Sequence, residues 1–167
     1  MPAFSRELRG GALYDINIYN LHLVIGLYGM PNKVSYWANT GFNGIDTSGV
    51  AILDYGDWKA VCIGAKDARN SAETILTGQN GILKLNGPPN LFTSFQYEID
   101  GKKGEYSDTT FSTHMVYEFR EFERMYREDD WETIVKCMNH TLSVMRVAEA
   151  LRKDAGIVFP CDEKEFV

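Results

Sequence analysis

One uninterrupted stretch near the start of the chain decides how the rest must be organised. It covers residues 12–28 and reads Ala-Leu-Tyr-Asp-Ile-Asn-Ile-Tyr-Asn-Leu-His-Leu-Val-Ile-Gly-Leu-Tyr. The stretch has no proline, is apolar on nearly every side, and is followed by Gly29 and Pro31, which are typical of helix ends. Its Ile and Tyr content also suits a strand, but its length favours a helix. Because a helix that is apolar all round is buried on most faces, the stretch predicts a core helix.

One face of this predicted helix carries polar groups. Asp15, Tyr19, His22 and Gly26 follow each other at i, i+4, i+7 and i+11, which places a carboxylate, a phenol, an imidazole and a gap together. A carboxylate beside a phenol can transfer protons, with the Tyr as acid or base and the Asp as the orienting group. The alternative is structural: Asp15 caps or pairs with a neighbouring segment, and Tyr19 is a core aromatic with a satisfied hydroxyl. The spacing leaves both interpretations open.

From Lys33 to about Asp100 the pattern changes to short strand-like runs separated by turn residues such as Gln79-Asn80-Gly81 and Asp100-Gly101. Six runs are predicted as strands: residues 34–38, 49–54, 58–63, 72–77, 82–85 and 91–99. No helix-length pattern separates them. They therefore predict an antiparallel or mixed sheet of about six or more strands rather than βαβ units. The polar stretch 101–112 that follows is assigned no strand.

The helical period returns after this polar stretch. Apolar residues at spacings of three and four predict one helix, and a second is predicted to begin after Asp129 or Asp130, either of which can cap it. Their apolar stripes are Met115, Phe119, Phe122 and Tyr126, then Trp131, Ile134/Val135, Met138, Leu142, Met145 and Leu151. The whole chain, residues 1–167, is thus predicted to be a single α+β domain: an open, largely antiparallel sheet with helices packed on one face.

Composition excludes several classes of protein. The 167 residues contain 17 Lys plus Arg and 23 Asp plus Glu, for a net charge of −6, and no basic run exceeds two residues, so we expect no nucleic-acid partner. The longest strongly apolar stretch, residues 21–28, is far short of the roughly 20 residues of a membrane helix, so we expect no membrane partner. Residues 1–7 lack the apolar core of a signal peptide, and the odd set Cys62, Cys137 and Cys161 has no CxxC spacing. These features predict a cytoplasmic protein with free thiols.

Nucleotide and metal signatures are also missing. No two of the 15 glycines are separated by a single residue, so the Gly-x-Gly core of a dinucleotide-binding turn is absent, as is GxxxxGK[ST]. Cys137 and His140 at i and i+3 resemble half of a metal site, but no second ligand pair accompanies them. We therefore expect no metal and no nucleotide site within the chain.

Three segments resemble the C-terminal domain of the Gfo/Idh/MocA oxidoreductases, the family of glucose–fructose oxidoreductase, inositol dehydrogenase and dimeric dihydrodiol dehydrogenase. Residues 10–19 are similar to the GGxLxDxGx[HY] segment that opens that domain. The second segment comprises residues 49–56 and, after an intervening strand, residues 73–88, which resemble the family's ALLxF-G and I-GTEG-I-I-GP hairpins; the third, residues 140–156, resembles its closing helix. The resemblance thus extends from about Leu8 to Gly156.

The resemblance implies a role for specific residues. It implies a full-length enzyme that oxidises the CH–OH group of a sugar, polyol or dihydrodiol with NAD or NADP. Asp15 and Tyr19 match the family's proton-transfer positions, and Asn17, Asn20 and His22 are implied substrate contacts. Asn17 departs from the family pattern, which usually has Gly there. A homodimer formed through the open face of the sheet is also implied.

The family's Rossmann domain, with its GxGxxG turn and the Lys of its EKP segment, matches no part of this chain. We therefore expect a detached substrate-binding and dimerisation domain that binds no NAD or NADP by itself and is inactive alone. One alternative is a stand-alone, non-enzymatic module that dimerises or binds a small polyol. Another is a small-ligand-binding protein that shares only the fold.

Overall fold

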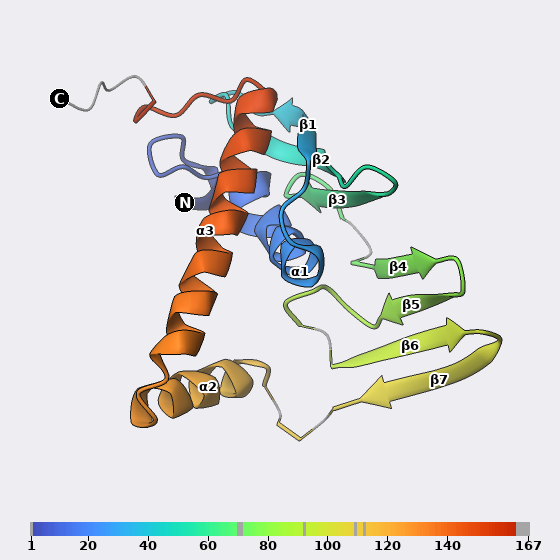
Figure 1. The fold of residues 1–167 in the computed structure, drawn as a ribbon. Helices are drawn as coiled ribbons and strands as arrows, with labels where there is room; N and C mark the ends of the chain where they lie inside the picture. Colours follow the sequence, from blue (N-terminus) through green and yellow to red (C-terminus); the bar gives the residue numbers. More distant parts are fainter. Residues whose placement is uncertain (1, 70–71, 92, 109, 112, 163–167) are drawn as a thin grey trace. The chain divides into compact units, whose positions relative to one another are not determined.

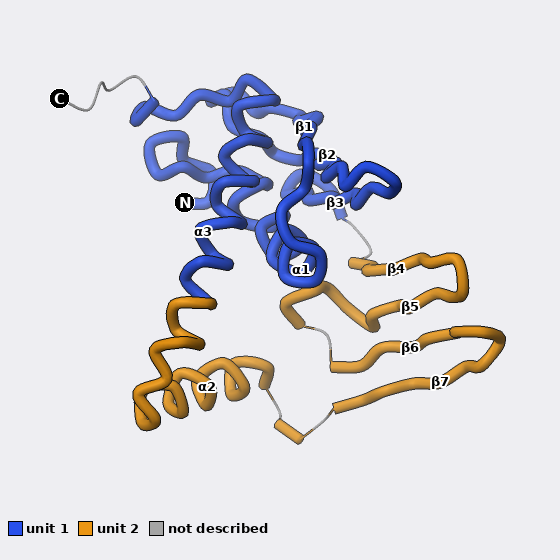
Figure 2. Tube along the Cα trace, viewed as in Figure 1, with its two compact units in different colours: residues 1–70, 137–167 blue, residues 71–136 orange. Residues whose placement is uncertain are grey.

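The computed structural model describes residues 2–69, 72–91, 93–108, 110, 111 and 113–162. Helices and antiparallel strands follow one another along the chain as in Figure 1. The chain divides into two compact units, residues 1–70 with 137–167 and residues 71–136 (Figure 2), and the last helix crosses the boundary between them. The two units are described separately below, and the expectation of a single domain stays a prediction.

The first unit contains a three-stranded antiparallel sheet in the order β1-β2-β3. Its strands are β1 (Lys33–Thr40), β2 (Asp46–Asp54) and β3 (Lys59–Ala65), all three predicted from the sequence. A short 3₁₀ turn, Pro2–Phe4, lies at the start of the chain.

Two helices accompany this sheet. The predicted helix over residues 12–28 is confirmed, but its first turn is a π-helix, Leu13–Asn17, and only Ile18–Tyr28 forms the α-helix α1. The prediction that it is buried on most faces is wrong, because only Leu21 and Ile25 of α1 are buried and its apolar C-terminal end is about half exposed. The second, α3 (Trp131–Asp154), ends near the predicted Gly156, whose φ of 68° suits a glycine just beyond a helix. Its residues from Cys137 onward belong to the first unit.

The core of the first unit lies between these helices and one face of the sheet. Tyr36, Ala51 and Cys62 are aligned across the three strands by the pairing register, and all are buried. They share one cluster with Leu21 and Ile25 of α1 and with Val144, Val147 and Leu151 of α3. The opposite face, where Trp37 is 65% and Ile63 52% exposed, is apolar. The prediction that helices pack on one face of a sheet is therefore confirmed for this unit.

The second unit contains a four-stranded antiparallel meander, β4 (Thr74–Gly78), β5 (Gly81–Leu85), β6 (Ser94–Ile99) and β7 (Lys102–Ser107). Strand β7 lies in the polar stretch to which we assigned no strand, and that assignment was wrong. Its Lys-Lys-Gly-Glu-Tyr-Ser sequence lacks an apolar alternation. It becomes a strand by pairing with β6 through the two-residue turn Asp100-Gly101, where both residues have positive φ, 50° and 75°.

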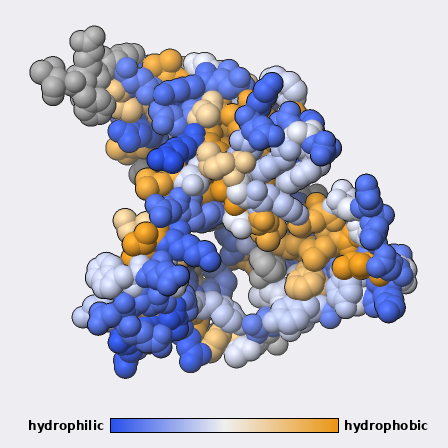
Figure 3. Space-filling model, in the orientation of Figure 1, coloured by the Kyte–Doolittle hydropathy of each residue, from blue (hydrophilic) through white to orange (hydrophobic). Residues whose placement is uncertain are grey.

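The meander has one apolar face. The register aligns Leu76, Leu83 and Tyr97, and also Leu85, Phe95 and Tyr106. The other face carries polar residues such as Lys84, Gln96 and Glu105, which alternate with them. Figure 3 shows apolar residues gathered over β4 and β5.

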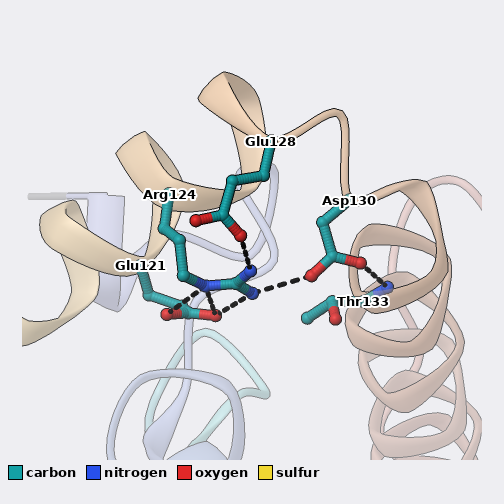
Figure 4. A network of polar contacts seen from close by, with 5 residues as sticks. All are labelled: Glu121, Arg124, Glu128, Asp130 and Thr133. Atoms are coloured by element: carbon teal, nitrogen blue, oxygen red, sulfur yellow. Dashed lines mark hydrogen bonds and ion pairs between the residues drawn. The ribbon is translucent and has the colours of Figure 1, made fainter.

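The corner between α2 (Met115–Arg127) and α3 is held by an ionic network (Figure 4). The guanidinium of Arg124 donates to Glu121, Glu128 and Asp130. Oδ1 of Asp130 accepts a 3.1 Å hydrogen bond from the backbone N–H of Thr133. Asp130 therefore caps α3, as one of the two predicted alternatives.

The α+β class predicted from the sequence is confirmed. The strands form two antiparallel sheets, of three and four strands, in the part of the chain that the structure describes. None of the described helices is both long and apolar enough to cross a bilayer.

Candidate functional site

The segment that precedes the core helix is tied to the sheet by a buried carboxylate. Asp46 is 3% exposed, and its Oδ2 accepts hydrogen bonds from the backbone N–H of Leu13 (2.6 Å) and from the hydroxyl of Tyr36 (2.7 Å). Gly11 has a φ of 132° and faces Oδ1 of Asp46 so closely that a side chain would collide with it. The first N–H groups of a helix have no partner within it, and here Asp46 supplies one to the N–H of Leu13.

The same carboxylate affects the phenol. Burial, and next the negative charge of Asp46, raise the pKa of Tyr36, so its hydroxyl keeps its proton and acts as the donor. Neither Asp46 nor Tyr36 was singled out as a functional residue from the sequence. Their contribution is to hold the opening segment in place.

Asn17 and Asn20 attach the helix to β3. Asn17 is fully buried; its Nδ2 donates to the carbonyl oxygen of Cys62 (3.1 Å), and its Oδ1 accepts from Nδ2 of Asn20 (2.8 Å). Asn20 Nδ2 also donates to the carbonyl oxygen of Ile63 (3.2 Å). Gly64 makes this contact possible, because a Cβ there would lie 3.0 Å from Cβ of Asn17. The two residues are brought together, with their amide groups engaged by β3 and by each other.

Asp15 projects from the π-helical turn and pairs with a neighbouring segment, as the structural interpretation of the sequence expected; its partner, Lys66, was not singled out. Its Oδ2 lies 2.9 Å from Nζ of Lys66; the Lys66 side chain is 5% exposed and the Asp15 side chain 49%. Nζ of Lys66 also donates to the carbonyl oxygen of Ala3 (2.6 Å) and lies 4.7 Å from the centre of the Phe4 ring. A lone lysine just after a strand carries no sequence signal for such a role.

Tyr19 lies one helical turn beyond Asp15 and is 44% exposed. Among the described residues its hydroxyl has no hydrogen-bond partner, so it is available to a ligand. π-Helical turns inside α-helices occur frequently at functional sites. The π-helical turn of this chain contains Asp15, four residues before Tyr19. The exposed carboxylate and phenol thus share the start of a helix whose other polar groups are committed to the fold.

His22 points elsewhere, toward α3. Its Nδ1 lies 3.0 Å from Nε2 of His140, and both rings are half-buried. Burial, with a smaller effect of His140, lowers the pKa of His22. The structure therefore gives His140 the partner His22, whereas the sequence spacing had paired His140 with Cys137. No cluster of three or more His, Cys, Asp or Glu side chains suited to a metal occurs among the described residues.

A separate hollow of about 420 Å³ lies in the second unit, lined by Leu91, Thr93, Tyr106, Asp108, Phe111, Thr113, His114 and Tyr117. None of the residues predicted as functional lines it.

The chain is similar in sequence to two known oxidoreductases. No family model matches the chain. Scyllo-inositol 2-dehydrogenase (NADP(+)) IolU of Bacillus subtilis is 27% identical over 166 residues, which are 98% of this chain and 50% of that protein. The uncharacterized oxidoreductase YgjR of Escherichia coli is 27% identical over 169 residues, 96% of this chain and 47% of that protein.

Solved structures agree on the fold. UDP-N-acetylglucosamine 3-dehydrogenase GnnA of Acidithiobacillus ferrooxidans superposes with a TM-score of 0.65 at 13% identity, over 91% of this chain and 51% of that one. The chain thus spans about half the length of the proteins it matches, and the matched half is their C-terminal part. The resemblance to the C-terminal domain of Gfo/Idh/MocA-like oxidoreductases is therefore confirmed.

Proposed function

We propose that the chain is the substrate-binding and dimerisation domain of an NAD(P)-dependent oxidoreductase that acts on the CH–OH group of a sugar, polyol or dihydrodiol. The observation that carries this proposal is the solvent-facing pair at the helix start: a Tyr19 hydroxyl with no described partner, one turn from an Asp15 carboxylate held by a buried lysine. Both residues lie in the segment 10–19, which resembles the opening of the C-terminal domain of the Gfo/Idh/MocA oxidoreductases.

Oxidation of a carbinol removes a hydride from carbon and a proton from oxygen. The nicotinamide, when bound, accepts the hydride. The residues of this chain do not provide its site, because the Gly-x-Gly turn that lets a backbone approach the pyrophosphate is absent from the sequence. This chain would handle the proton: in the oxidation the deprotonated Tyr19 Oη accepts the proton of the substrate hydroxyl, and in the reverse reduction the phenol donates it back. Asp15, fixed by Lys66, orients the phenol and the substrate.

A chimeric enzyme tests this role. The C-terminal half of the Bacillus subtilis relative is replaced by this chain, and NADP-dependent oxidation of inositols, hexoses and dihydrodiols is followed by NADPH absorbance. We expect turnover of at least one of these substrates, and a loss of about 10²–10⁴-fold in kcat for Tyr19→Phe. Tyr126→Phe, at a tyrosine that is 83% exposed in the second unit, is the matched control and should keep full activity.

Inactivity of the isolated chain is tested separately by titrating it with NADPH and following fluorescence. We expect no binding and no turnover. Micromolar binding accompanied by oxidation of any polyol would contradict the proposal that the dinucleotide site lies outside this chain. Polyol binding by the chain, with no activity in a folded chimera, would support the stand-alone binding module instead.

Dimerisation is proposed through the open face of β1–β3, where Trp37, Val50 and Ile63 are aligned by the register. We expect sedimentation equilibrium to show a dimer, and Ile63→Lys to shift it to monomer. Leu8→Lys, at a residue that is 64% exposed and belongs to none of the three strands, should leave the dimer intact. A wild-type monomer at micromolar concentration would overturn this part of the proposal.

The same proposal places the protein in the cytoplasm, where its cysteines Cys62, Cys137 and Cys161, all free thiols, would stay reduced. Fractionation of the source cells with an antibody against the chain tests this, and recovery from a secreted fraction would contradict it.

A further inference from the structure

Two of the three histidines of the chain meet, although 118 residues separate them. Nδ1 of His22 on α1 and Nε2 of His140 on α3 are 3.0 Å apart, and the ring centres are 5.0 Å apart at an interplanar angle of 61°. Both rings are half-buried, so solvent reaches the pair. Within the part of the chain that the structure describes, neither histidine forms a hydrogen bond or ion pair with Asp15 or Lys66, and the pair takes no part in the proton transfer proposed above.

The separation of the two nitrogens suits a shared metal ion. Imidazole nitrogens bind Zn²⁺ at about 2.0–2.1 Å, so two of them in adjacent positions of a tetrahedral or octahedral site lie about 2.9–3.4 Å apart. The observed 3.0 Å falls within this range. In the absence of metal the same distance is spanned by one N–H hydrogen bond between the rings.

The residue of α1 next to His140 has no side chain. It is Gly26, one turn beyond His22 on the same helix, and an added Cβ there would stand 3.5 Å from Cε1 and 4.0 Å from Nε2 of His140. The net charge of −6 favours a cation over an anion near the chain. Because no third His, Cys, Asp or Glu completes a cluster among the described residues, the protein would supply two ligands and water the others.

We propose that His22 and His140 form a two-histidine site for a divalent first-row transition metal ion of the imidazole-binding class, such as Zn²⁺ or Ni²⁺. The facing nitrogens, Nδ1 of His22 and Nε2 of His140, bind the ion through their lone pairs. No electron transfer is involved. The ion would link α1, which carries Tyr19 at its first turn, to α3, so its binding would stiffen the helix that presents the candidate site.

The test uses the tag-free chain of residues 1–167, because a polyhistidine tag would bind the same ions. Thermal unfolding is measured in EDTA and in saturating NiCl₂ or ZnCl₂, and affinity by calorimetry. We expect metal to raise Tm by roughly 3 °C or more, because a ligand that binds only the folded state stabilises it. We expect the increase to disappear in His22→Ala and in His140→Ala. His114→Ala, which changes the third histidine, is the matched control and should retain it.

The quantity compared is the difference in Tm between metal and EDTA within each variant. A variant that is less stable than the wild type in EDTA therefore still shows whether metal stabilises it. Should either histidine variant be unfolded in EDTA, ¹⁵N-detected histidine NMR of the wild type decides: the proposal requires that Ni²⁺ broaden the signals of His22 and His140 while those of His114 persist. Equal metal-induced shifts in wild type and His22→Ala, or loss of the shift only in Cys137→Ser, would overturn the proposal.

Discussion

Nζ of Lys66 lies 2.9 Å from Oδ2 of Asp15, and the two charges of this ion pair differ sharply in their exposure, 5% against 49% of the side chain. The lysine is the buried member, with the Ala3 carbonyl and the Phe4 ring as its other partners. An ion pair of this kind does not respond equally to the loss of either residue.

Removing Asp15 should therefore cost more than removing Lys66. Asp15→Ala leaves a buried ammonium without its counter-charge and should lower the free energy of unfolding by about 2 kcal/mol, whereas Lys66→Met replaces that charge by an apolar chain and should cost about 1 kcal/mol or less. Urea unfolding measures both. The double variant should be more stable than Asp15→Ala alone. A double variant less stable than Asp15→Ala would show that the ammonium of Lys66 is effectively solvated.

The buried pair of Tyr36 and Asp46 should show strong coupling. Tyr36→Phe removes one of the two donors to Oδ2 and should cost about 1–2 kcal/mol; Asp46→Ala also leaves the Leu13 N–H unpaired and should cost about 3 kcal/mol. Because both changes break the same contact, their effects should fall short of additivity by at least about 0.5 kcal/mol. Denaturant unfolding of the two single variants and the double variant completes the cycle, and strict additivity would argue that the contact contributes nothing.

Asn17 should behave as a structural residue. Asn17→Ala removes the donor to the Cys62 carbonyl and the acceptor of Asn20 in a fully buried position, so it should lower the free energy of unfolding by about 2 kcal/mol. Tyr19→Phe, at an exposed position on the same helical segment, should change it by less than about 0.5 kcal/mol. If thermal unfolding showed Asn17→Ala to be as stable as the wild type, Asn17 would be free for a substrate role instead.

The cap of α3 predicts a dependence on acid pH. Hydrogen bonds from Arg124, and next from the backbone of Thr133, lower the pKa of Asp130 from 3.8 to about 2. A carboxyl whose pKa is lower in the folded than in the unfolded state adds stability above its unfolded value, and this contribution is lost as the pH falls from about 4 to about 2. Asp130→Asn should thus be less stable than the wild type at pH 7 and equal to it near pH 2. Urea unfolding across this range provides the measurement, and a constant difference down to pH 2 would rule out the ionised cap as its source.

Much of the fold could be read from local patterns. The core helix, the two later helices and six of the seven strands are marked by periodicity, and Asp130 by its place before an apolar run. Strand β7 was not predicted because apolar and polar residues do not alternate along it; its pairing with β6 through a two-residue turn makes it a strand. The π-helical turn was not predicted either, since a helical repeat of 3.6 residues was assumed throughout.

By itself, then, the sequence determined the α+β class, the positions of nearly all its elements, the polar face of the first helix and the resemblance to the C-terminal half of the dehydrogenases. Only the tertiary structure decided which polar side chains have partners within the fold and which are open to a ligand. It gave Asp15 its buried lysine, joined Asp46 to Leu13 and Tyr36, set Asn17 against β3, and brought His22 to His140. The reason is physical: periodicity reports on residues within a few turns of each other, whereas several of these partners lie 33 to 118 residues apart and meet only when helices pack on the sheet.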